Sequence, residues 1–285
     1  MSELIQARGL GKSFGSTRAL DGVSFKVGTG RIVGLIGPNG AGKTTALKAV
    51  LGLTRFEGEL SVLGLDPYRQ RHRLMQDVCF IADVAVLPRW IRVSRLIDFV
   101  AATHPRFRRE VCDHFLERSD VRRTSRVKEL SKGMITQLHL ALVMAIDAKL
   151  LVLDEPTLGL DILMRKQFYE TLLNEYFDEQ RTILVTTHQV EEVEHILTDL
   201  LFIDRGRIVL DAAMDDVQEK YAQVSVRPEH VAAARTLQPI AERQGLGRTH
   251  MLFQGAERGE LERLGEVGVP SVADLFVAVI QGARA

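Results

Sequence analysis

Cysteine, aromatic residues and net charge are all scarce in this chain of 285 residues. It contains 2 cysteines, 1 tryptophan and 6% aromatic residues, and 37 Lys and Arg balance 37 Asp and Glu. Cys79 and Cys112 lie far apart and outside any paired motif, which favours idle thiols in a reducing compartment over a disulfide framework. Zero net charge argues against a nucleic-acid binder that works through a global positive field, although a local basic patch stays possible.

Long hydrophobic runs are also missing from the sequence. A membrane-spanning helix needs ~18 consecutive apolar residues, whereas the best candidate, 140–146, is a short run between His139 and Asp147. The N-terminus shows no basic-then-apolar signal pattern. We therefore expect the protein in the cytosol, unless another component brings it to a membrane. The 46% of hydrophobic residues suffice for a sizeable core without disulfide or metal staples.

Short apolar runs alternate along the chain with longer segments of helical periodicity. Continuous apolar runs favour strands covered on both faces, and strands that alternate with helices predict an α/β architecture with a mainly parallel sheet. The expected strands are 32–36, 78–81, 150–153, 182–186 and 200–203, and the expected helices are 43–52, 94–102, 108–118, 131–147, 164–177 and 189–196.

The two ends of the chain differ from this pattern. Segments 4–9 and 23–27, joined by a turn rich in glycine and serine, predict an antiparallel strand pair beside the main sheet. A shift in composition near residue 215 predicts a small appended α+β domain. Within it we expect strands at 223–227 and 249–254, a helix at 229–243, and two further helical stretches.

The strongest single motif is Gly37-Pro38-Asn39-Gly40-Ala41-Gly42-Lys43-Thr44, which fits G-x-x-x-x-G-K-[ST] between an expected strand and an expected helix. Its glycines let backbone N–H groups wrap a polyphosphate, and the helix N-terminus adds a favourable dipole. Lys43 supplies a positive charge to the β- and γ-phosphates, and the Thr44 hydroxyl can ligate Mg²⁺. A chance match is the alternative, which the strand–loop–helix context disfavours. The motif therefore predicts nucleotide binding.

Charged residues follow two of the expected strands. Asp154 and Glu155 end an apolar run, where Asp154 is suited to hold Mg²⁺ and Glu155 to act as general base on a water. His188 ends another, at the sheet edge where open α/β folds bind ligands, and there it can contact the γ-phosphate or the water. Ordinary solvated carboxylates and a structural histidine are the alternatives.

The segment Leu130-Ser131-Lys132-Gly133-Met134 precedes the acidic strand and opens an expected helix. With the other motifs, in this order and spacing, it resembles the ATP-binding cassette (ABC) ATPases, in the LSKGM form of one group of transporter ATPases. Ser131 also reads as a plain helix N-cap, and the two roles are compatible because a helix start is an anion site. The resemblance covers about residues 3–216, and 270–276 look like the end of drug- and antibiotic-type exporter subunits.

The resemblance implies roles for further residues. Thr45 belongs to the phosphate loop, Asp161 falls in the segment that follows the acidic strand, and His188 matches the family's switch histidine. Phe14 stands where the family stacks an aromatic ring, usually Tyr, on adenine, and a core position is its alternative. Asp83 stands where the family has Gln or Glu; it either keeps an oxygen ligand for Mg²⁺ on a shorter arm or has lost that role.

The resemblance also implies partners. Two ATPase subunits, identical or paralogous, pair head to tail, so that each ATP lies between the phosphate loop of one and the Ser131–Met134 signature of the other. A membrane permease contacts the segment from Asp83 to Phe99. Apolar contacts there would come from 84–87, Trp90, Ile91 and Phe99, and rim charges from Arg89, Arg92 and Arg95, although a core and a solvated helix face are the alternative. Seven further arginines (106, 108, 109, 118, 122, 123 and 126) predict solvated helix faces, or else attraction to an anionic inner leaflet.

The sequence thus predicts an α/β phosphate-loop cassette at 1–216, with a helical subdomain at about 84–148, and an accessory α+β domain at 217–285. Its expected function is ATP binding and hydrolysis for a transporter, most simply an exporter, on the inner face of the cell membrane. A soluble, non-transport ABC ATPase is the first alternative, but the chain has neither a long coiled coil nor two cassettes in tandem. A regulatory module that holds ATP without turnover is the second.

Overall fold

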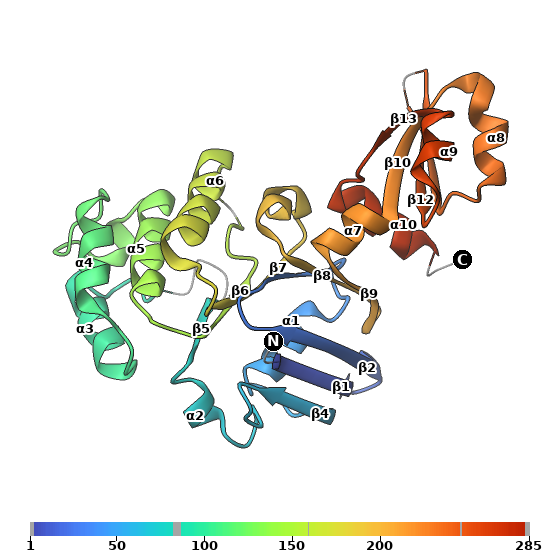
Figure 1. Cartoon of the computed structure of the whole chain (residues 1–285). Coiled ribbons are helices and arrows are strands. Elements are labelled where there is room, and N and C mark those ends of the chain that lie inside the picture. Colours follow the sequence, from blue (N-terminus) through green and yellow to red (C-terminus); the bar gives the residue numbers. More distant parts are fainter. Residues whose placement is uncertain (1–2, 82–86, 159, 246, 283–285) are drawn as a thin grey trace.

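The computed structural model of the protein describes residues 3–81, 87–158, 160–245 and 247–282. Its centre is a six-stranded sheet in the order β5–β6–β7–β3–β8–β9 (Figure 1). The first five strands of this sheet are parallel and the last runs antiparallel to its neighbour. The predicted α/β fold is confirmed. The strands are β5 (Val78–Ile81), β6 (Leu150–Asp154), β7 (Thr182–Thr187), β3 (Ile32–Ile36), β8 (Asp199–Asp204) and β9 (Arg207–Ala213).

A second, antiparallel sheet packs against the first. It has the order β2 (Thr17–Gly28), β1 (Glu3–Phe14), β4 (Glu57–Val62). The predicted strand pair is thus confirmed, while β4 is an addition to the prediction. Leu10 and Val23 of this sheet share a buried cluster with Leu47 of α1 (Lys43–Val50) and Leu35 of β3. Because this cluster fills the space around α1, the start of that helix is held at the carboxyl end of β3. The short α2 (Arg71–Leu74) follows β4.

Helices gather on the β5 side of the sheet (Figure 1). They are α3 (Val93–Thr103), α4 (Arg109–Glu117), the 3₁₀ turn η1 (Val127–Glu129) and α5 (Lys132–Met144). Leu96, Cys112 and Leu138 belong to their common core. Next in the chain after β6 come α6 (Ile162–Thr171) and a π-helical turn, η2 (Leu172–Tyr176), whose buried Phe168, Tyr169 and Tyr176 pack on the central sheet.

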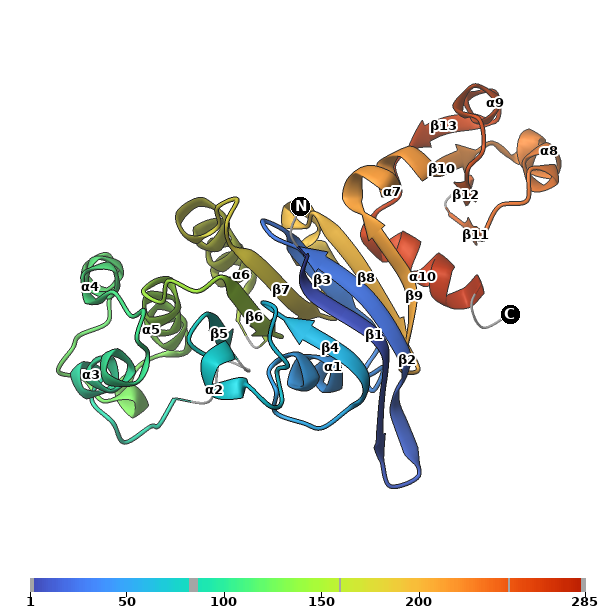
Figure 2. The ribbon, with the colours of Figure 1, turned by 60° about the horizontal axis from the view of Figure 1, so that its bottom comes forward.

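The last elements, from α7 onward and here called the tail, lie beyond β9 (Figures 1 and 2). The strands pair in the order β11–β12–β10–β13, all antiparallel. This order, with a helix in each of two crossovers, is that of the ferredoxin-like unit. The elements are α7 (Met214–Lys220), β10 (Tyr221–Val226), η5 (Pro228–His230), α8 (Val231–Thr236), β11 (Ala241–Gln244), β12 (Thr249–Gln254), α9 (Arg258–Glu262), β13 (Gly265–Gly268) and α10 (Val272–Gly282).

The tail has a core of its own and also returns to the rest of the molecule. Val224, Phe253 and Leu261 belong to a separate buried cluster beneath α8 and α9. In contrast, Leu275 of α10 joins the main cluster, and the Phe276 ring meets the Phe202 ring edge to face at 5.1 Å. The last helix therefore ties the tail to the central sheet.

Two predicted helices are wrong. Segment 189–196 is not one helix but two 3₁₀ turns, η3 (Val190–Glu192) and η4 (Glu194–Ile196). Its buried residues Val190, Val193 and Ile196 recur every three positions, the period at which 3₁₀ side chains line up. The helix expected at 229–243 ends at Thr236, because Pro239 lacks the N–H that a continuing helix must donate, and 241–244 form β11 instead. Within the described residues, every helix is too short or too polar to span a bilayer.

Candidate functional site

The loop between β3 and α1 has the shape that the glycines predict. Gly40 has φ +80° and Gly42 has φ +112°, a region that side-chain-bearing residues rarely occupy. A Cβ added at Gly37 would lie 2.3 Å from the Ile203 carbonyl oxygen, so the loop also needs glycine for its close approach to β8. The Gly206 N–H donates to the Ala41 oxygen at 2.9 Å, which anchors the loop from the β8–β9 turn.

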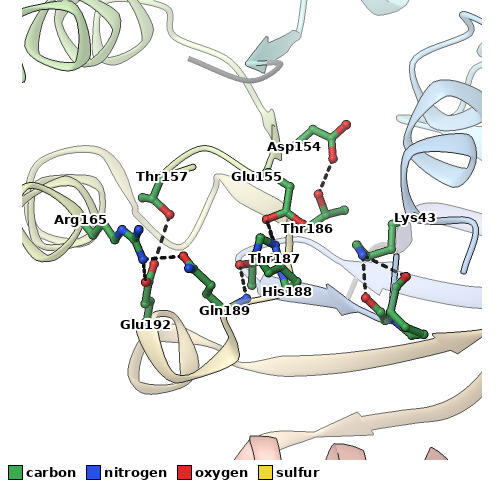
Figure 3. A network of polar contacts seen from close by, with 12 residues as sticks. Lys43, Asp154, Glu155, Thr157, Arg165, Thr186, Thr187, His188, Gln189 and Glu192 are labelled. Atoms are coloured by element: carbon green, nitrogen blue, oxygen red, sulfur yellow. Dashed lines mark hydrogen bonds and ion pairs between the residues drawn. The ribbon is translucent and has the colours of Figure 1, made fainter. Parts of the chain in front are cut away.

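Lys43 lies inside this loop. Only 7% of the residue is exposed to solvent. Its Nζ donates to the carbonyl oxygens of Gly37 at 2.6 Å and Pro38 at 3.3 Å (Figure 3). Burial lowers the pKa of the Lys43 ammonium, while Glu155 and Asp154 act in the opposite direction. A buried cation held by neutral carbonyls is only partly compensated. An anion that enters the loop is therefore a stronger partner for the Lys43 ammonium than the two carbonyl oxygens are.

Asp154 lies at the carboxyl end of β6, paired in register with Thr186 of β7. The Thr186 hydroxyl donates to Asp154 Oδ1 at 2.6 Å, which fixes the carboxylate (Figure 3). Thr186 itself is fully buried. One carboxylate oxygen is thus held by the protein while the other stays available as a ligand. The Thr44 hydroxyl, at the exposed start of α1, is the second hard oxygen that the sequence assigned to Mg²⁺.

The residues predicted as base and switch, Glu155 and His188, contact each other. His188 Nδ1 lies 2.9 Å from Glu155 Oε2, and the His188 backbone N–H donates to the same oxygen at 3.4 Å. Glu155 has φ +49°, an unusual conformation for a residue with a side chain. Its own N–H donates to the Thr186 oxygen at 3.1 Å. The structure therefore joins two residues that are 33 positions apart in the sequence at one edge of the sheet (Figure 3).

Polar residues that sequence reasoning missed form a network beside this pair (Figure 3). Arg165 of α6 donates to Gln189 Oε1 at 2.6 Å, to the Leu160 carbonyl oxygen at 2.7 Å, and to Glu192 in an ion pair. Thr157 donates to the other oxygen of Glu192 at 3.2 Å. No motif marks Arg165, Gln189 or Glu192, because they meet only when the segments after β6 and β7 are brought together.

The signature segment 131–134 opens α5 as predicted. Ser131 caps the helix, its Oγ accepting the Met134 N–H at 3.2 Å. A Cβ added at Gly133 would lie 3.2 Å from Met164 Cε, so the signature packs closely on α6. Ser131 and Lys132 are exposed. In both views of the ribbon, α5 lies apart from α1, with β5 and β6 between them (Figures 1 and 2). The chain does not bring its signature to its own phosphate loop.

The other predicted site residues have surface positions. Phe14 is 53% exposed near the tip of the β1–β2 hairpin, with Lys12 Nζ 5.1 Å from its ring centroid, which disfavours the core alternative. Asp161 caps α6, its Oδ1 accepting the Met164 N–H at 2.9 Å. The neighbouring Ile162 and Leu163 are 85% and 75% exposed. Thr45 is half-buried in the first turn of α1. Asp83 and 84–86 lie outside the described residues.

The segment assigned to the permease divides into two faces. Trp90 and Phe99 are 71% and 62% exposed, whereas Ile91 and Leu87 pack partly against the helical core. Arg89, Arg92 and Arg95 are exposed beside them. Most of the seven further arginines are in ion pairs with acidic residues, which favours solvated helix faces. The pairs are Arg106–Asp77, Arg108–Glu110, Arg109–Asp98, Arg118–Glu175 and Arg123–Asp113.

Known proteins are similar to this chain in both sequence and fold. Residues 20–158 match the family model described as ABC transporter. "Nod factor export ATP-binding protein I" of Rhizobium sp. (strain N33) is 35% identical, over 76% of this chain and 73% of its own. The chain belongs to the ABC transporter family. It is an ATP-binding subunit and an ATPase of that family, as the motifs predicted.

Two further matches extend this assignment. The protein of the same name from Cupriavidus metallidurans (strain ATCC 43123 / DSM 2839 / NBRC 102507 / CH34) is 30% identical over 92% of this chain and 89% of its own. Residues 1–216 make up a smaller share of this chain than the 92% that is matched, so the similarity continues into the tail. A solved structure described as "Structure of ATP binding subunit of ABC transporter" superimposes with a TM-score of 0.66 at 26% identity, over 76% of this chain and 92% of that one.

Proposed function

We propose that this ABC ATPase is the energy-supplying subunit of an exporter, that it dimerises on ATP, and that it drives a separate membrane permease. The observation that carries the proposal is the Glu155–His188 contact at the sheet edge that also holds the phosphate loop and Asp154. Export is supported by the relatives whose names include it, one of which matches through the tail.

The residues of the loop fit a nucleoside triphosphate. Two glycines with positive φ open the backbone of the loop, and among the described residues the hydrogen-bond partners of the buried Lys43 ammonium are neutral carbonyls. Exposed Phe14 offers a ring face to a base. In the proposed arrangement, residues 37–45 hold the phosphates and Lys43 exchanges the Gly37 and Pro38 oxygens for phosphate oxygens.

The residues also fit Mg²⁺ with phosphate oxygens as co-ligands. Among the described residues, His, Cys, Asp and Glu form no cluster that could hold a metal by itself. A hydroxyl and one carboxylate, from Thr44 and Asp154, are the donors that Mg²⁺ takes in such incomplete sites. When bound, the cation neutralises charge on the transferred phosphoryl group. Asp83, outside the described residues, is the third proposed ligand.

Glu155 is proposed as general base and His188 as its partner. With the proton on Nδ1, His188 donates to Glu155 Oε2, so the histidine orients the carboxylate that accepts the water's proton. Nε2 then carries a lone pair and is left to accept a hydrogen bond from the water, whereas contact with a phosphate oxygen requires a proton on Nε2. The contact between the two side chains means that both are placed by one geometry. A displacement of either segment therefore changes both roles.

A dimer is proposed because the signature is remote from its own phosphate loop. Exposed Ser131 and the first amides of α5, with Lys132, Gly133 and Met134, form an anion cradle that a second subunit's ATP can reach. The exposed apolar side chains beside Asp161 suit an interface at the same face. The partner is a second copy or a paralogue.

We propose a cassette at 1–216 with its helical subdomain at about 84–148, and an accessory domain at 217–285. The permease would be contacted between Asp83 and Phe99, where Trp90 and Phe99 leave large apolar side chains exposed. The subunit would then lie on the inner face of the membrane through that permease.

The test is capture of a permease by the tagged chain, co-expressed with a multi-helix membrane protein encoded beside it. Trp90→Ala and Phe99→Asp should abolish co-purification while ATP hydrolysis by the isolated subunit stays. Val277→Asp, which changes a 50% exposed residue of the tail, is the matched control. Co-purification that survives both the Trp90 and the Phe99 variant would contradict the permease contact, and absence of ATP hydrolysis in the parent would contradict the energy-supplying role.

A further inference from the structure

Arg165 joins the two segments that follow Glu155 and His188. It stands in the first turn of α6, and its guanidinium has three partners, of which Gln189 and Glu192 are drawn in Figure 3. Nε donates to the Leu160 carbonyl oxygen at 2.7 Å, which belongs to the segment after β6. Nη1 donates to Gln189 Oε1 at 2.6 Å and forms an ion pair with Glu192, both in the segment after β7.

The guanidinium is the only side-chain group with the geometry for this set of contacts. Its five N–H donors lie in one plane with fixed directions, so a backbone oxygen and two side chains can be bound at once. A lysine ammonium is a point charge on a flexible stem and cannot reproduce the set. The Arg165 and Glu192 side chains are only 19% and 22% exposed, so solvent screens the pair less than a surface pair.

A second connection runs parallel to the first. Thr157, two residues after Glu155, donates to Glu192 Oε2 at 3.2 Å, and its hydroxyl lies 3.4 Å from the Tyr169 hydroxyl. Glu192 is thus held from both sides. The Arg165 network bridges backbone on either side of the Glu155–His188 contact, yet none of its side chains is part of that contact.

We propose that Arg165 is a positioning residue for hydrolysis: it fixes the segment that carries Glu155 against the segment that carries His188. The unusual φ of Glu155 supports this, since a strained backbone persists only where its surroundings determine it. Arg165 acts through the pair and does not contact nucleotide. The inference rests on the proposed roles of Glu155 and His188.

The experiment separates kcat from nucleotide affinity in Arg165→Ala, Arg165→Lys and Glu192→Gln. Misplacement of catalytic groups by ~1 Å costs on the order of 10²-fold in rate, so kcat should fall 10- to 100-fold in all three. ATP affinity, measured by a fluorescent analogue, should stay within twofold because the phosphate loop is untouched. Lys166→Ala, on the next position of α6 with an exposed side chain, is the control that should keep the parent kcat.

Two outcomes overturn the proposal. One is parent kcat in Arg165→Ala. The other is a parallel loss of kcat, ATP affinity and melting temperature in all three variants, which indicates a purely structural role. Arg165→Lys and Glu192→Gln, which keep nearly the same volume, cover the case in which the alanine variant fails to fold. Glu155→Gln is run alongside: turnover in that variant would contradict the base assignment itself, whereas an inactive Glu155→Gln with an unaffected Arg165→Ala contradicts only the positioning role.

Discussion

His188 and Glu155 occupy the ends of neighbouring strands and meet through Nδ1 and Oε2 at 2.9 Å. The parallel sheet produces this contact, because the last pair in the register of β6 and β7 is Asp154 and Thr186. Glu155 follows one residue after this pair and His188 two residues after it. The proposed base and its orienting partner are thereby placed by the pairing of the two strands. Preorganised groups of this kind accelerate a reaction without reorganisation at the moment of proton transfer.

Replacement of Glu155 by Gln should stop turnover while nucleotide binding persists. The amide has nearly the same shape as the carboxylate but cannot accept the water's proton, so kcat should fall by about 10²- to 10⁴-fold. In the proposed dimer ATP lies between the two subunits, so nucleotide that is not hydrolysed should keep them together. Phosphate release and size-exclusion chromatography with ATP measure the two effects. Steady hydrolysis near the parent rate would show that Glu155 is not the base.

Replacement of Lys43 by Ala should remove nucleotide affinity. The ammonium is the only side-chain charge inside the described loop, and it is held there by two carbonyl oxygens. Loss of a charge-assisted contact to phosphate costs about 1.5–3 kcal/mol, which corresponds to at least tenfold weaker binding by calorimetry. The exposed Lys48→Ala, on the same helix, is the control that should bind as the parent does. Unchanged affinity in Lys43→Ala would contradict the role of the loop.

The Thr186 hydroxyl should be needed for metal affinity although it is not a proposed ligand. Its 2.6 Å hydrogen bond orients the Asp154 carboxylate, and removal of such a partner typically weakens metal binding or activity by about 10- to 100-fold. Thr186→Val should therefore raise the Mg²⁺ concentration required for half-maximal ATPase activity by that factor. Thr182→Val, at the other end of β7, also removes a buried hydroxyl and should leave the Mg²⁺ requirement unchanged.

The sequence predicted the parts of the fold that repeat a simple physical pattern. The predicted bounds of strands 32–36, 78–81 and 249–254 are the bounds found in the structure. Short apolar runs of this kind seldom form anything but a strand, so their pattern predicts them well. Edge strand β13 was not predicted, because two of its residues are glycines. Gly265 is needed there, since a Cβ added at this position would lie 2.2 Å from the Ser225 carbonyl oxygen. A close approach between segments 40 residues apart leaves no local signal.

The same division holds for the site. Lys43, Asp154 and Glu155 belong to local motifs whose chemistry can be read from the residues alone. Arg165 and Glu192 are ordinary surface-type residues on helical segments, and only the folded chain shows that they meet. Side-chain networks between segments depend on the tertiary structure, so single-sequence reasoning finds the motif residues and misses those that position them.

Acid should destabilise the protein through His139 of α5. Burial lowers the pKa of this imidazole to about 4, and among the described residues its Nδ1 is a buried atom with no hydrogen-bond partner. In the unfolded chain the pKa is near 6.5, so below that pH the unfolded state binds the extra proton. The contribution of His139 to the free energy of unfolding is therefore unchanged above pH 6.5, and it falls by on the order of 2–3 kcal/mol as the pH is lowered to 4. Urea unfolding across this range should show a flatter profile for His139→Leu, while the exposed His72→Ala should follow the parent.

The attachment of α10 should depend on Glu194. The Val272 N–H, in the first turn of α10, donates to Glu194 Oε1 at 3.0 Å, while Ser271 Oγ accepts the Asp274 N–H at 3.0 Å. The carboxylate thus satisfies a helix-terminal donor that has no partner within the helix. Glu194→Ala should weaken the attachment by about 1–2 kcal/mol, seen as roughly tenfold faster hydrogen exchange in the first turn of α10. The neighbouring exposed Glu191→Ala should leave that exchange unchanged. Equal exchange in Glu194→Ala and the parent would mean that the apolar contacts of Leu275 and Phe276 hold α10 by themselves.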